Sequence, residues 1–399
     1  MIWEIYEARD RNKSLIINNI NVYSKYQPCK DAELWIDSNY NSNYEAYHLI
    51  GLGLGYHLEA LLKKDNSKKV TVYYLYKEEM FIFRRYGKVK CANKRVKFKW
   101  IMDGITNFSE NTQLLVPSVW IQTLPPTNGK IKDYLDIIKL KQNSYRNSEE
   151  SMIINFENNT RCFNTVFTPQ KVKNKKACLV SAGPSLSQTV KWLKNINSHI
   201  DIYVVGTALK FIENNNIRPK GVFHSDPSIS NLVQFENTEF KGKLYYLSTS
   251  NNKVVNNHAG EKCIVFQKGY DLSEGYAKSY SYPLVETGGS VATLGFSIIE
   301  ALGYEELVLF GQDLSFQKEN THIIESTSNR IISSENSRLI VSNSGESVKT
   351  TLGMLAFLYW FEKRFKKTEM KVYNTSLQGA KIKYTEMINE FEFKNWAEN

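Results

Sequence analysis

The stretch from Thr287 to His322 constrains this sequence most, because it specifies a helix and a strand in succession. It opens with a Thr-Gly-Gly-Ser turn at 287–290 and continues with an apolar segment from Val291 to Leu302. A hydroxyl residue of the turn can cap a helix whose first N–H groups lack partners, and Gly303 can take the left-handed conformation that ends one. The pattern therefore predicts a buried helix over 291–302 with both ends specified.

A short β-branched and aromatic segment, Glu306 to Phe310, follows that helix after a brief turn. This succession is typical of a parallel strand reached through a crossover helix. Ligands of open parallel sheets bind outside the carboxyl ends of the strands. We therefore expect Gln312, Asp313 and the loop that carries His322 to lie where chemistry is done. The Gly-Gly turn before the helix offers bare N–H donors, which suit an anionic ligand.

Three earlier segments also pair a predicted strand with small or polar residues at its end. The strands are expected over 177–180, 202–205 and 221–223. Because the carboxyl ends of parallel strands share one edge, their loops are expected to converge. The loop at 181–186 resembles a phosphate cradle, although it lacks the lysine of a P-loop. The other interpretation is that all these residues are ordinary turn formers. The ligand-binding candidates of these loops are Gly183, Pro184, Ser185, Thr207 and Asp226.

The N-terminal part contains a second glycine-rich turn. A predicted strand over 46–50 runs into Gly51-Leu52-Gly53-Leu54-Gly55, and a second strand is expected over 70–75. A nucleotide-binding fold places an acid directly after that second strand, but here the chain reads Tyr76-Lys77-Glu78-Glu79. Two interpretations stay open, a Rossmann-like module without catalysis and a module that binds a nucleotide. His57 either packs beneath the turn or touches a ligand.

These patterns predict an α/β protein with a Rossmann-like doubly wound parallel sheet in a central domain. A smaller α/β N-terminal domain and a helical linker are expected before it. The predicted segments are 1–132 for the N-terminal domain, 133–170 for the linker, 171–385 for the catalytic domain and 386–399 for a tail. Amphipathic helices are expected in the linker. Near the end, a short strand is predicted at Arg338 to Val341 and a helix from Val348 to Phe365.

Charge and cysteine usage exclude several classes of protein. Lysine and arginine number 51 and aspartate and glutamate 41, a net charge of +10. The charge is spread out without a basic-aromatic motif, so we predict no nucleic-acid binding. No apolar run approaches the length of a membrane helix, and we expect a cytoplasmic protein without membrane insertion. Five scattered cysteines without a Cys-x-x-Cys pair suggest neither disulfides nor zinc. We predict no metal site.

Four stretches resemble the motility accessory factor (Maf) family of flagellin glycosyltransferases. They are Ser24 to Pro28, the Gly51 to His57 turn, Ala182-Gly183-Pro184-Ser185-Leu186, and Thr287 to His322. The segment Asn374 to Ala380 is similar to the closing motif of the family, with departures at Ser376 and Gln378. The resemblance runs from about residue 1 to 382. Its second domain is also similar to bacterial sialyltransferases that use CMP-sugars.

The resemblance implies transfer of a nonulosonic acid, pseudaminic or legionaminic acid, from CMP to serine or threonine hydroxyls of flagellin. Flagellin and the CMP-nonulosonic acid are the implied partners, and the activated sugar is a donor substrate, with no cofactor. His322 is the implied general base, with Asp313 as the second catalytic residue. The residues expected to hold the nucleotide are Gly183, Pro184, Ser185, Thr207, Asp226, Thr287, Gly288, Gly289, Ser290 and Gln312.

One departure and two alternatives qualify that interpretation. The sialyltransferases carry tyrosines after the aspartate to stabilise the leaving phosphate, whereas Ser315 and Phe316 stand here. A hydroxymethylpterin pyrophosphokinase-like enzyme is one alternative. It would use ATP and Mg²⁺, for which Asp226 and Asp313 are the candidate carboxylates. A non-catalytic flagellin-binding protein is the other. The oligomeric state is not predicted.

Overall fold

The structure is a computed structural model of the 399-residue chain. It describes residues 2–87, 89, 93–101, 112–124, 129–194, 196, 199–317, 320–323, 326 and 337–398. Cys91 lies outside the described residues. The chain divides into two compact units, Met1–Lys139 and Leu140–Asn399, which we call unit 1 and unit 2. The four segments predicted from the sequence remain a prediction. Within the described ranges, no helix combines the length and apolar character that a membrane span requires.

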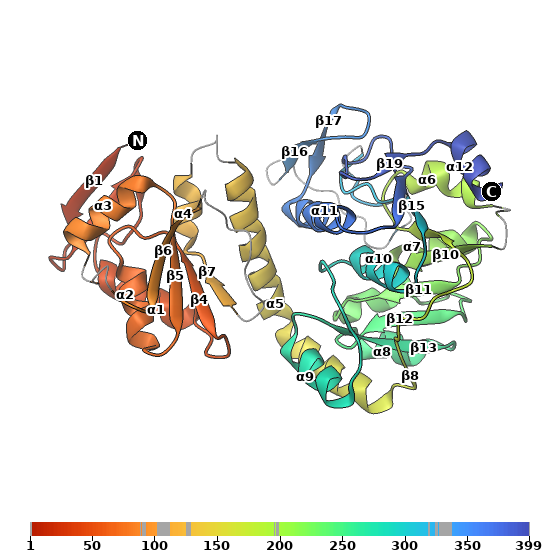
Figure 1. Cartoon of the computed structure of the whole chain (residues 1–399), viewed down its shortest axis with the longest axis horizontal. Coiled ribbons are helices and arrows are strands. Elements are labelled where there is room, and N and C mark those ends of the chain that lie inside the picture. Colours follow the sequence, from red (N-terminus) through yellow and green to blue (C-terminus); the bar gives the residue numbers. More distant parts are fainter. Residues whose placement is uncertain are drawn as a thin grey trace. The chain divides into compact units, whose positions relative to one another are not determined.

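Unit 1 is built on a parallel four-stranded sheet with the strand order β6-β5-β4-β7. Helices α1 and α2 pack side by side against it (Figure 1). A separate antiparallel sheet has the order β1-β2-β3. The elements are β1 (Trp3–Glu7), β2 (Lys13–Ile17), β3 (Ile20–Asn21), α1 (Pro28–Asn39), β4 (Ala46–Ile50), α2 (Tyr56–Lys64), β5 (Lys69–Tyr74), α3 (Lys77–Tyr86), β6 (Val96–Trp100), β7 (Thr112–Leu115) and α4 (Ser118–Thr123).

The glycine-rich turn between β4 and α2 encloses a carboxylate of the chain itself. Glu79 is fully buried, and one of its oxygens accepts the N–H groups of Leu52 and Gly53 at 2.5 and 3.0 Å. Its other oxygen accepts the N–H groups of Leu75 and Tyr76 at 2.7 and 2.9 Å. Burial raises the pKa of Glu79 to about 7, although these four N–H donors lower it. A carboxyl group of the chain therefore occupies the N–H donors of a turn that would otherwise suit a phosphate.

His57 packs beneath this turn. Its ring is buried, stacks on Tyr23 with 5.5 Å between centroids and meets Trp35 edge-on at 5.3 Å. Burial lowers the pKa of His57 to about 4, so the ring is neutral at physiological pH. Of the two interpretations of this histidine, the packed one is confirmed.

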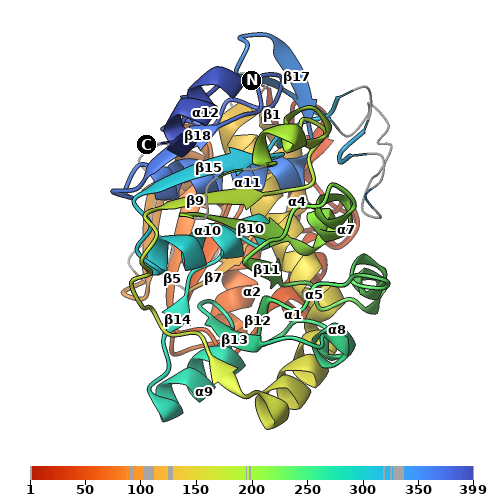
Figure 2. The same ribbon diagram turned by 90° about the vertical axis from the view of Figure 1, so that its right-hand side faces the viewer.

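Unit 2 contains a ten-stranded sheet whose pairs are all parallel. Its order is β14-β13-β12-β11-β10-β9-β15-β18-β19, with β8 beside β13, and Figure 2 shows the central strands side by side in this order. Strands β9 to β14 follow one another toward one edge of the sheet, and β15 then pairs with the other side of β9. Such a reversal is a topological switch point. The α/β, Rossmann-like doubly wound fold is thus confirmed.

The strands of unit 2 lie close to their predicted positions, but two predicted helical segments are wrong. The linker contains one continuous helix, α5, instead of several. Residues 348–350 belong to strand β17, which pairs with β16, so α11 starts at Leu352. The elements are α5 (Gly129–Cys162), β8 (Thr165–Val166), β9 (Lys176–Val180), α6 (Leu186–Thr189), η3 (Val190–Leu193), β10 (Ile200–Val205), α7 (Gly206–Asn214), β11 (Gly221–His224), η4 (Ile229–Gln234), β12 (Lys243–Leu247), α8 (Asn252–Asn257), β13 (Lys262–Gln267), α9 (Asp271–Tyr280), β14 (Leu284–Val285), α10 (Val291–Ala301), β15 (Glu306–Phe310), β16 (Arg338–Val341), β17 (Ser347–Thr350), α11 (Leu352–Phe365), β18 (Lys371–Asn374), β19 (Glu386–Met387) and α12 (Glu390–Glu398).

The buried helix α10 confirms the sequence prediction at both ends. The Ser290 hydroxyl accepts the Thr293 N–H, and the Thr293 side chain completes a capping box. Gly303 follows with a φ of +78°, in the left-handed region that favours glycine. The helix packs across β9, β10 and β11. There Gly295 lies against Phe223, because an added Cβ would stand 2.8 Å from that ring. This contact holds the start of α10 at the switch-point edge.

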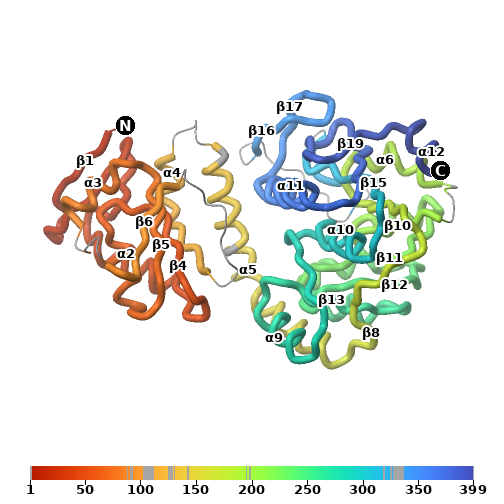
Figure 3. The backbone as a smooth tube through the Cα atoms, in the orientation of Figure 1, coloured from red at the N-terminus to blue at the C-terminus, as the bar shows by residue number. Residues whose placement is uncertain are grey.

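The C-terminal segment packs back onto the α6–η3 segment, as the trace in Figure 3 shows for α12 beside α6. Phe393 of α12 meets Phe310 edge-on with 5.2 Å between ring centroids and lies 6.0 Å from Trp192. Lys191 and Glu390 add an exposed ion pair at 3.3 Å. These contacts hold β15 and the α6–η3 segment together on one side of the sheet.

Candidate functional site

A cavity of about 330 Å³ lies at the switch point, where the loops after β9, β10, β11 and β15 converge. Its volume is at the low end of the range of ligand pockets. Most of the residues predicted to form the site line it. These are Gly183, Thr207, Asp226, Gly289, Ser290, Gln312, Asp313 and His322.

Four predicted residues do not line this cavity. They are Pro184, Ser185, Thr287 and Gly288. The Gly288 N–H donates to the Thr293 hydroxyl at 2.9 Å, and an added Cβ on Gly288 would stand 2.6 Å from the Trp360 ring. Gly288 thus supports the turn from behind. Gly289 faces the cavity with a φ of +94°.

Ser185 forms hydrogen bonds with Asp313. Its N–H and its hydroxyl both donate to one Asp313 oxygen, at 3.1 and 2.9 Å, and the Ser376 hydroxyl donates to the other oxygen. Asp313 is 1% exposed, and burial raises its pKa while these donors lower it. The loops after β9, β15 and β18 are therefore joined through one carboxylate, which we call the Asp313 clasp.

The backbone completes this connection. The Gly183 N–H donates to the Gly311 carbonyl at 2.8 Å, and an added Cβ on Gly183 would collide with the Asp313 carboxylate. The Ser181 hydroxyl donates to the Gln312 side-chain oxygen at 2.7 Å. Glycine at 183 is thus required by the close approach of two loops.

One wall of the cavity is the start of α10. The first N–H groups of a helix have no acceptor within the helix. Val291 and Ala292 provide two such groups, and both residues line the cavity beside Gly289. The helix dipole adds positive potential at this end. This wall favours an anionic group of a ligand.

His322 lies in the segment after β15 and lines the same cavity. Its Nδ1 and the Thr321 hydroxyl oxygen are 2.9 Å apart, and both residues line the cavity. The Ile323 N–H donates to the Ala182 carbonyl at 2.8 Å, which fixes this segment to the loop after β9. If Nδ1 carries the proton and donates it to Thr321, the neutral ring presents Nε2 as a base.

The loop that carries Asp226 is held in place by helix α5. The Ser228 N–H donates to the Asp226 carboxylate at 2.8 Å, and the next residue, Pro227, offers its carbonyl to the Asn155 side chain at 3.0 Å. One turn later, the Asn159 side chain donates to the carbonyls of Ser248 and Ser250 at 3.0 and 2.8 Å. Both asparagines are 3% exposed. This asparagine pair of α5 fixes the loops after β11 and β12.

The sequence analysis missed the contribution of helix α11 to the cavity. Met354 and Phe357 of α11 line the cavity, whereas no residue of the helix predicted over 348–365 was among the site candidates. The segment 374–380 is one of the stretches that carry the family resemblance. It contacts the clasp through Ser376 but contributes no residue to the cavity lining.

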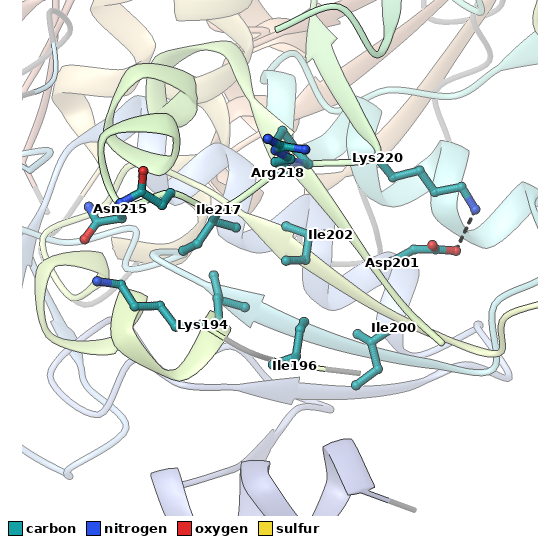
Figure 4. A pocket seen from close by; sticks show the side chains of 12 residues that line it. Lys194, Ile196, Ile200, Asp201, Ile202, Asn215, Ile217, Arg218 and Lys220 are labelled. Carbon is teal, nitrogen blue, oxygen red and sulfur yellow. Dashed lines mark hydrogen bonds and ion pairs between the residues drawn. The ribbon is translucent and has the colours of Figure 1, made fainter. Parts of the chain in front are cut away.

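A larger cavity of about 550 Å³ lies at the opposite edge of the sheet, between the start of β10 and the turn before β11 (Figure 4). The side chains of Lys194 and Arg218 lie apart there, and Lys220 is paired with Asp201 at 2.7 Å. Ligand sites place a few polar groups so that they converge. These cations do not converge, so the switch-point cavity is the better candidate.

Metal binding depends on which carboxylates are accessible. Among the described residues, no group of three or more histidine, cysteine or acidic side chains has the geometry of a metal site. Both oxygens of Asp313 accept hydrogen bonds within the clasp. Asp226 is the other carboxylate of the cavity lining. Catalysis without a protein-bound divalent metal stays a prediction.

Comparisons with known proteins support the fold of the chain. A family model described as 6-hydroxymethylpterin diphosphokinase MptE-like matches residues 150–319. Among solved structures, the chain is similar to a MAf glycosyltransferase from Magnetospirillum magneticum AMB-1, with a TM-score of 0.53 and 13% sequence identity. That match covers 99% of this chain and 73% of the other. A search of curated proteins found no match. At this identity the likeness shows the fold alone.

Proposed function

We propose that the protein is a glycosyltransferase that moves a nonulosonic acid from a CMP-sugar to hydroxyl groups of an acceptor protein. The observation that carries the proposal is the composition of the switch-point cavity. Its wall at Val291 and Ala292 offers N–H donors for one phosphate, and His322 offers a base within the same lining. The similarity of the fold to a MAf glycosyltransferase supports this activity.

In the proposed reaction, the acceptor hydroxyl attacks the anomeric carbon of the donor while the bond from that carbon to the phosphate oxygen of CMP breaks. Nε2 of His322 takes the hydroxyl proton, and Nδ1 stays bound to Thr321. The N–H groups at the start of α10 stabilise the charge that develops on the leaving phosphate. This assigns the leaving group to backbone donors, in place of the tyrosines that the sialyltransferases carry after the aspartate.

Asp313 takes part as a positioning residue in this proposal. Its carboxylate aligns the loops that carry Gly183 and Gln312, while its oxygens are occupied by Ser185 and Ser376. Pseudaminic or legionaminic acid as the donor sugar, and flagellin as the acceptor, follow from the Maf resemblance of the sequence.

The second candidate is a pyrophosphokinase, which the family model over 150–319 favours. Pyrophosphoryl transfer from ATP relies on Mg²⁺ bridging phosphate oxygens, and the metal needs carboxylate or other oxygen ligands. In the described cavity lining, the clasp occupies Asp313 and leaves Asp226 as the available carboxylate. The cavity therefore supports the glycosyltransferase better.

The test is the intact mass of flagellin after incubation with the purified protein and CMP-pseudaminic or CMP-legionaminic acid. We expect mass gains of whole sugar units, unchanged by EDTA and absent with His322→Ala. A parallel reaction contains ATP, Mg²⁺ and hydroxymethylpterin. The protein would be assigned to the second candidate if the first reaction transfers no sugar and the second releases AMP.

A further inference from the structure

Helix α11 presents one apolar face to the core and a second, smaller one to the cavity. Leu355, Leu358 and Phe361 of this helix are buried. Met354 and Phe357 are only half-buried, and both line the cavity. Residues three apart lie on the same face of a helix. An apolar face of a binding pocket is where a nonpolar part of a ligand packs.

This face lies directly beside the anion-binding wall. An added Cβ on Gly289 would stand 3.9 Å from the Phe357 ring, and the Trp360 ring packs on Gly288. The N–H donors of Val291 and Ala292 begin two residues after Gly289. When the phosphate of a ligand binds at the start of α10, the remainder of that ligand can therefore lie against Phe357.

The remaining lining separates the polar and apolar parts of such a ligand. Thr207 and Asp226 come from the ends of β10 and β11, and offer a hydroxyl and a carboxylate for ribose hydroxyls. Phe357 is the aromatic residue of the described lining. Aromatic side chains bind nucleobases by stacking, because every base has a π-face.

We propose that Phe357, supported by Met354, is the surface on which the nucleobase of the donor stacks. This inference rests on the proposed function, because it assumes that a nucleotide phosphate binds at the start of α10. Stacking selects a planar ring without selecting one particular base. Phe357 is thus a binding residue for the base and takes no part in the transfer of the sugar.

The experiment compares the binding of CMP and of ribose 5-phosphate, which lacks the base, by isothermal titration calorimetry. Phe357→Ala is expected to weaken CMP binding about tenfold or more, the range seen when a stacking aromatic is removed. It should leave ribose 5-phosphate binding within about twofold of wild type. Phe357→Tyr keeps a planar face and is expected to bind CMP like the wild type. Phe391→Ala on α12, where Phe391 is 71% exposed, is the matched control and should change neither affinity.

Phe357→Leu keeps apolar volume without a planar face, so it tests stacking even where the alanine variant folds poorly. A loss of CMP affinity in this variant, with ribose 5-phosphate unaffected, supports the proposal. Equal CMP binding by the wild type, the leucine variant and the alanine variant overturns it and leaves the proposed function standing. Equal losses for both ligands overturn it as well. A wild-type protein that binds neither ligand overturns both the inference and the proposed function.

Discussion

Replacing Asp313 tests whether its carboxylate reacts or holds the site together. In Asp313→Ala, the Ser185 N–H, the Ser185 hydroxyl and the Ser376 hydroxyl lose their buried acceptor. Each buried donor without a partner costs about 1–3 kcal/mol, so the free energy of unfolding should fall by roughly 3–9 kcal/mol. This is a large share of the stability of an ordinary domain, which is about 5–15 kcal/mol. We expect Asp313→Ala to be poorly folded.

Asp313→Asn has nearly the same shape and separates the two roles. Its amide oxygen can accept from Ser185, and its NH₂ group can donate to Ser376 once that hydroxyl rotates. The expected loss is about 1 kcal/mol, the net value of one hydrogen bond. Transfer activity should stay within about tenfold of wild type, because no charge of Asp313 is used in the reaction.

Urea unfolding followed by circular dichroism measures the stability, and the mass of the sugar acceptor measures the activity. Asp271→Ala, at the exposed start of α9, is the matched control and should cost less than about 1 kcal/mol. If Asp313→Asn unfolds like the wild type but transfers sugar more than 100-fold more slowly, the carboxylate acts in the chemistry. That outcome would refute the positioning role.

Three further predictions concern histidine and asparagine side chains. His322→Ala should reduce transfer by about 10²- to 10⁴-fold, as expected for a lost general base, while CMP affinity measured by calorimetry stays nearly unchanged; transfer within threefold of wild type would contradict the role. Burial lowers the pKa of His224 from 6.5 to about 3. The unfolded chain therefore binds a proton at this histidine more readily, and the free energy of unfolding falls as the pH is lowered from 6.5 toward 3. At pH 5 this loss is about 2 kcal/mol, and His224→Leu should abolish it in urea unfolding compared at pH 5 and 7.5; an unchanged pH dependence in the variant would count against it. Asn155→Leu removes the donor to the Pro227 carbonyl and should raise the KM for the donor about tenfold with little change in kcat, because a misplaced loop binds substrate less well. Asn158→Leu changes a half-buried position on the same helix, whose side chain donates within the helix to the Ile154 carbonyl, and it should match the wild type. Equal KM values for both variants would refute the assignment.

Elements with local signals could be predicted from the sequence. The hydroxyl cap at Ser290 and the glycine at 303 bracket α10, and both are read within a few residues. The strands before the switch-point loops are short apolar runs followed by turn-forming residues, so they could also be predicted from the sequence. Convergence of the loops then follows from parallel pairing, so eight of the predicted site residues line one cavity.

Features that depend on distant partners could not be predicted. Ser185 has the chemistry of a phosphate ligand, yet its acceptor is Asp313, 128 residues away. Phe357 lies in a helix with apolar residues on most faces, and sequence alone does not tell which of these faces a cavity. The strand β17 depends on its pairing with β16, which a short run at 348–350 does not reveal.

The buried carboxylate of unit 1 changes how its glycine-rich turn responds to nucleotides. Glu79 is tethered to the N–H groups of Leu52 and Gly53, so it competes with any free phosphate as an intramolecular ligand. Short tethers give effective concentrations of about millimolar or more. A nucleotide phosphate would have to displace this carboxyl group before it could accept the same N–H groups. In a titration of the whole protein, saturation should report the switch-point cavity alone.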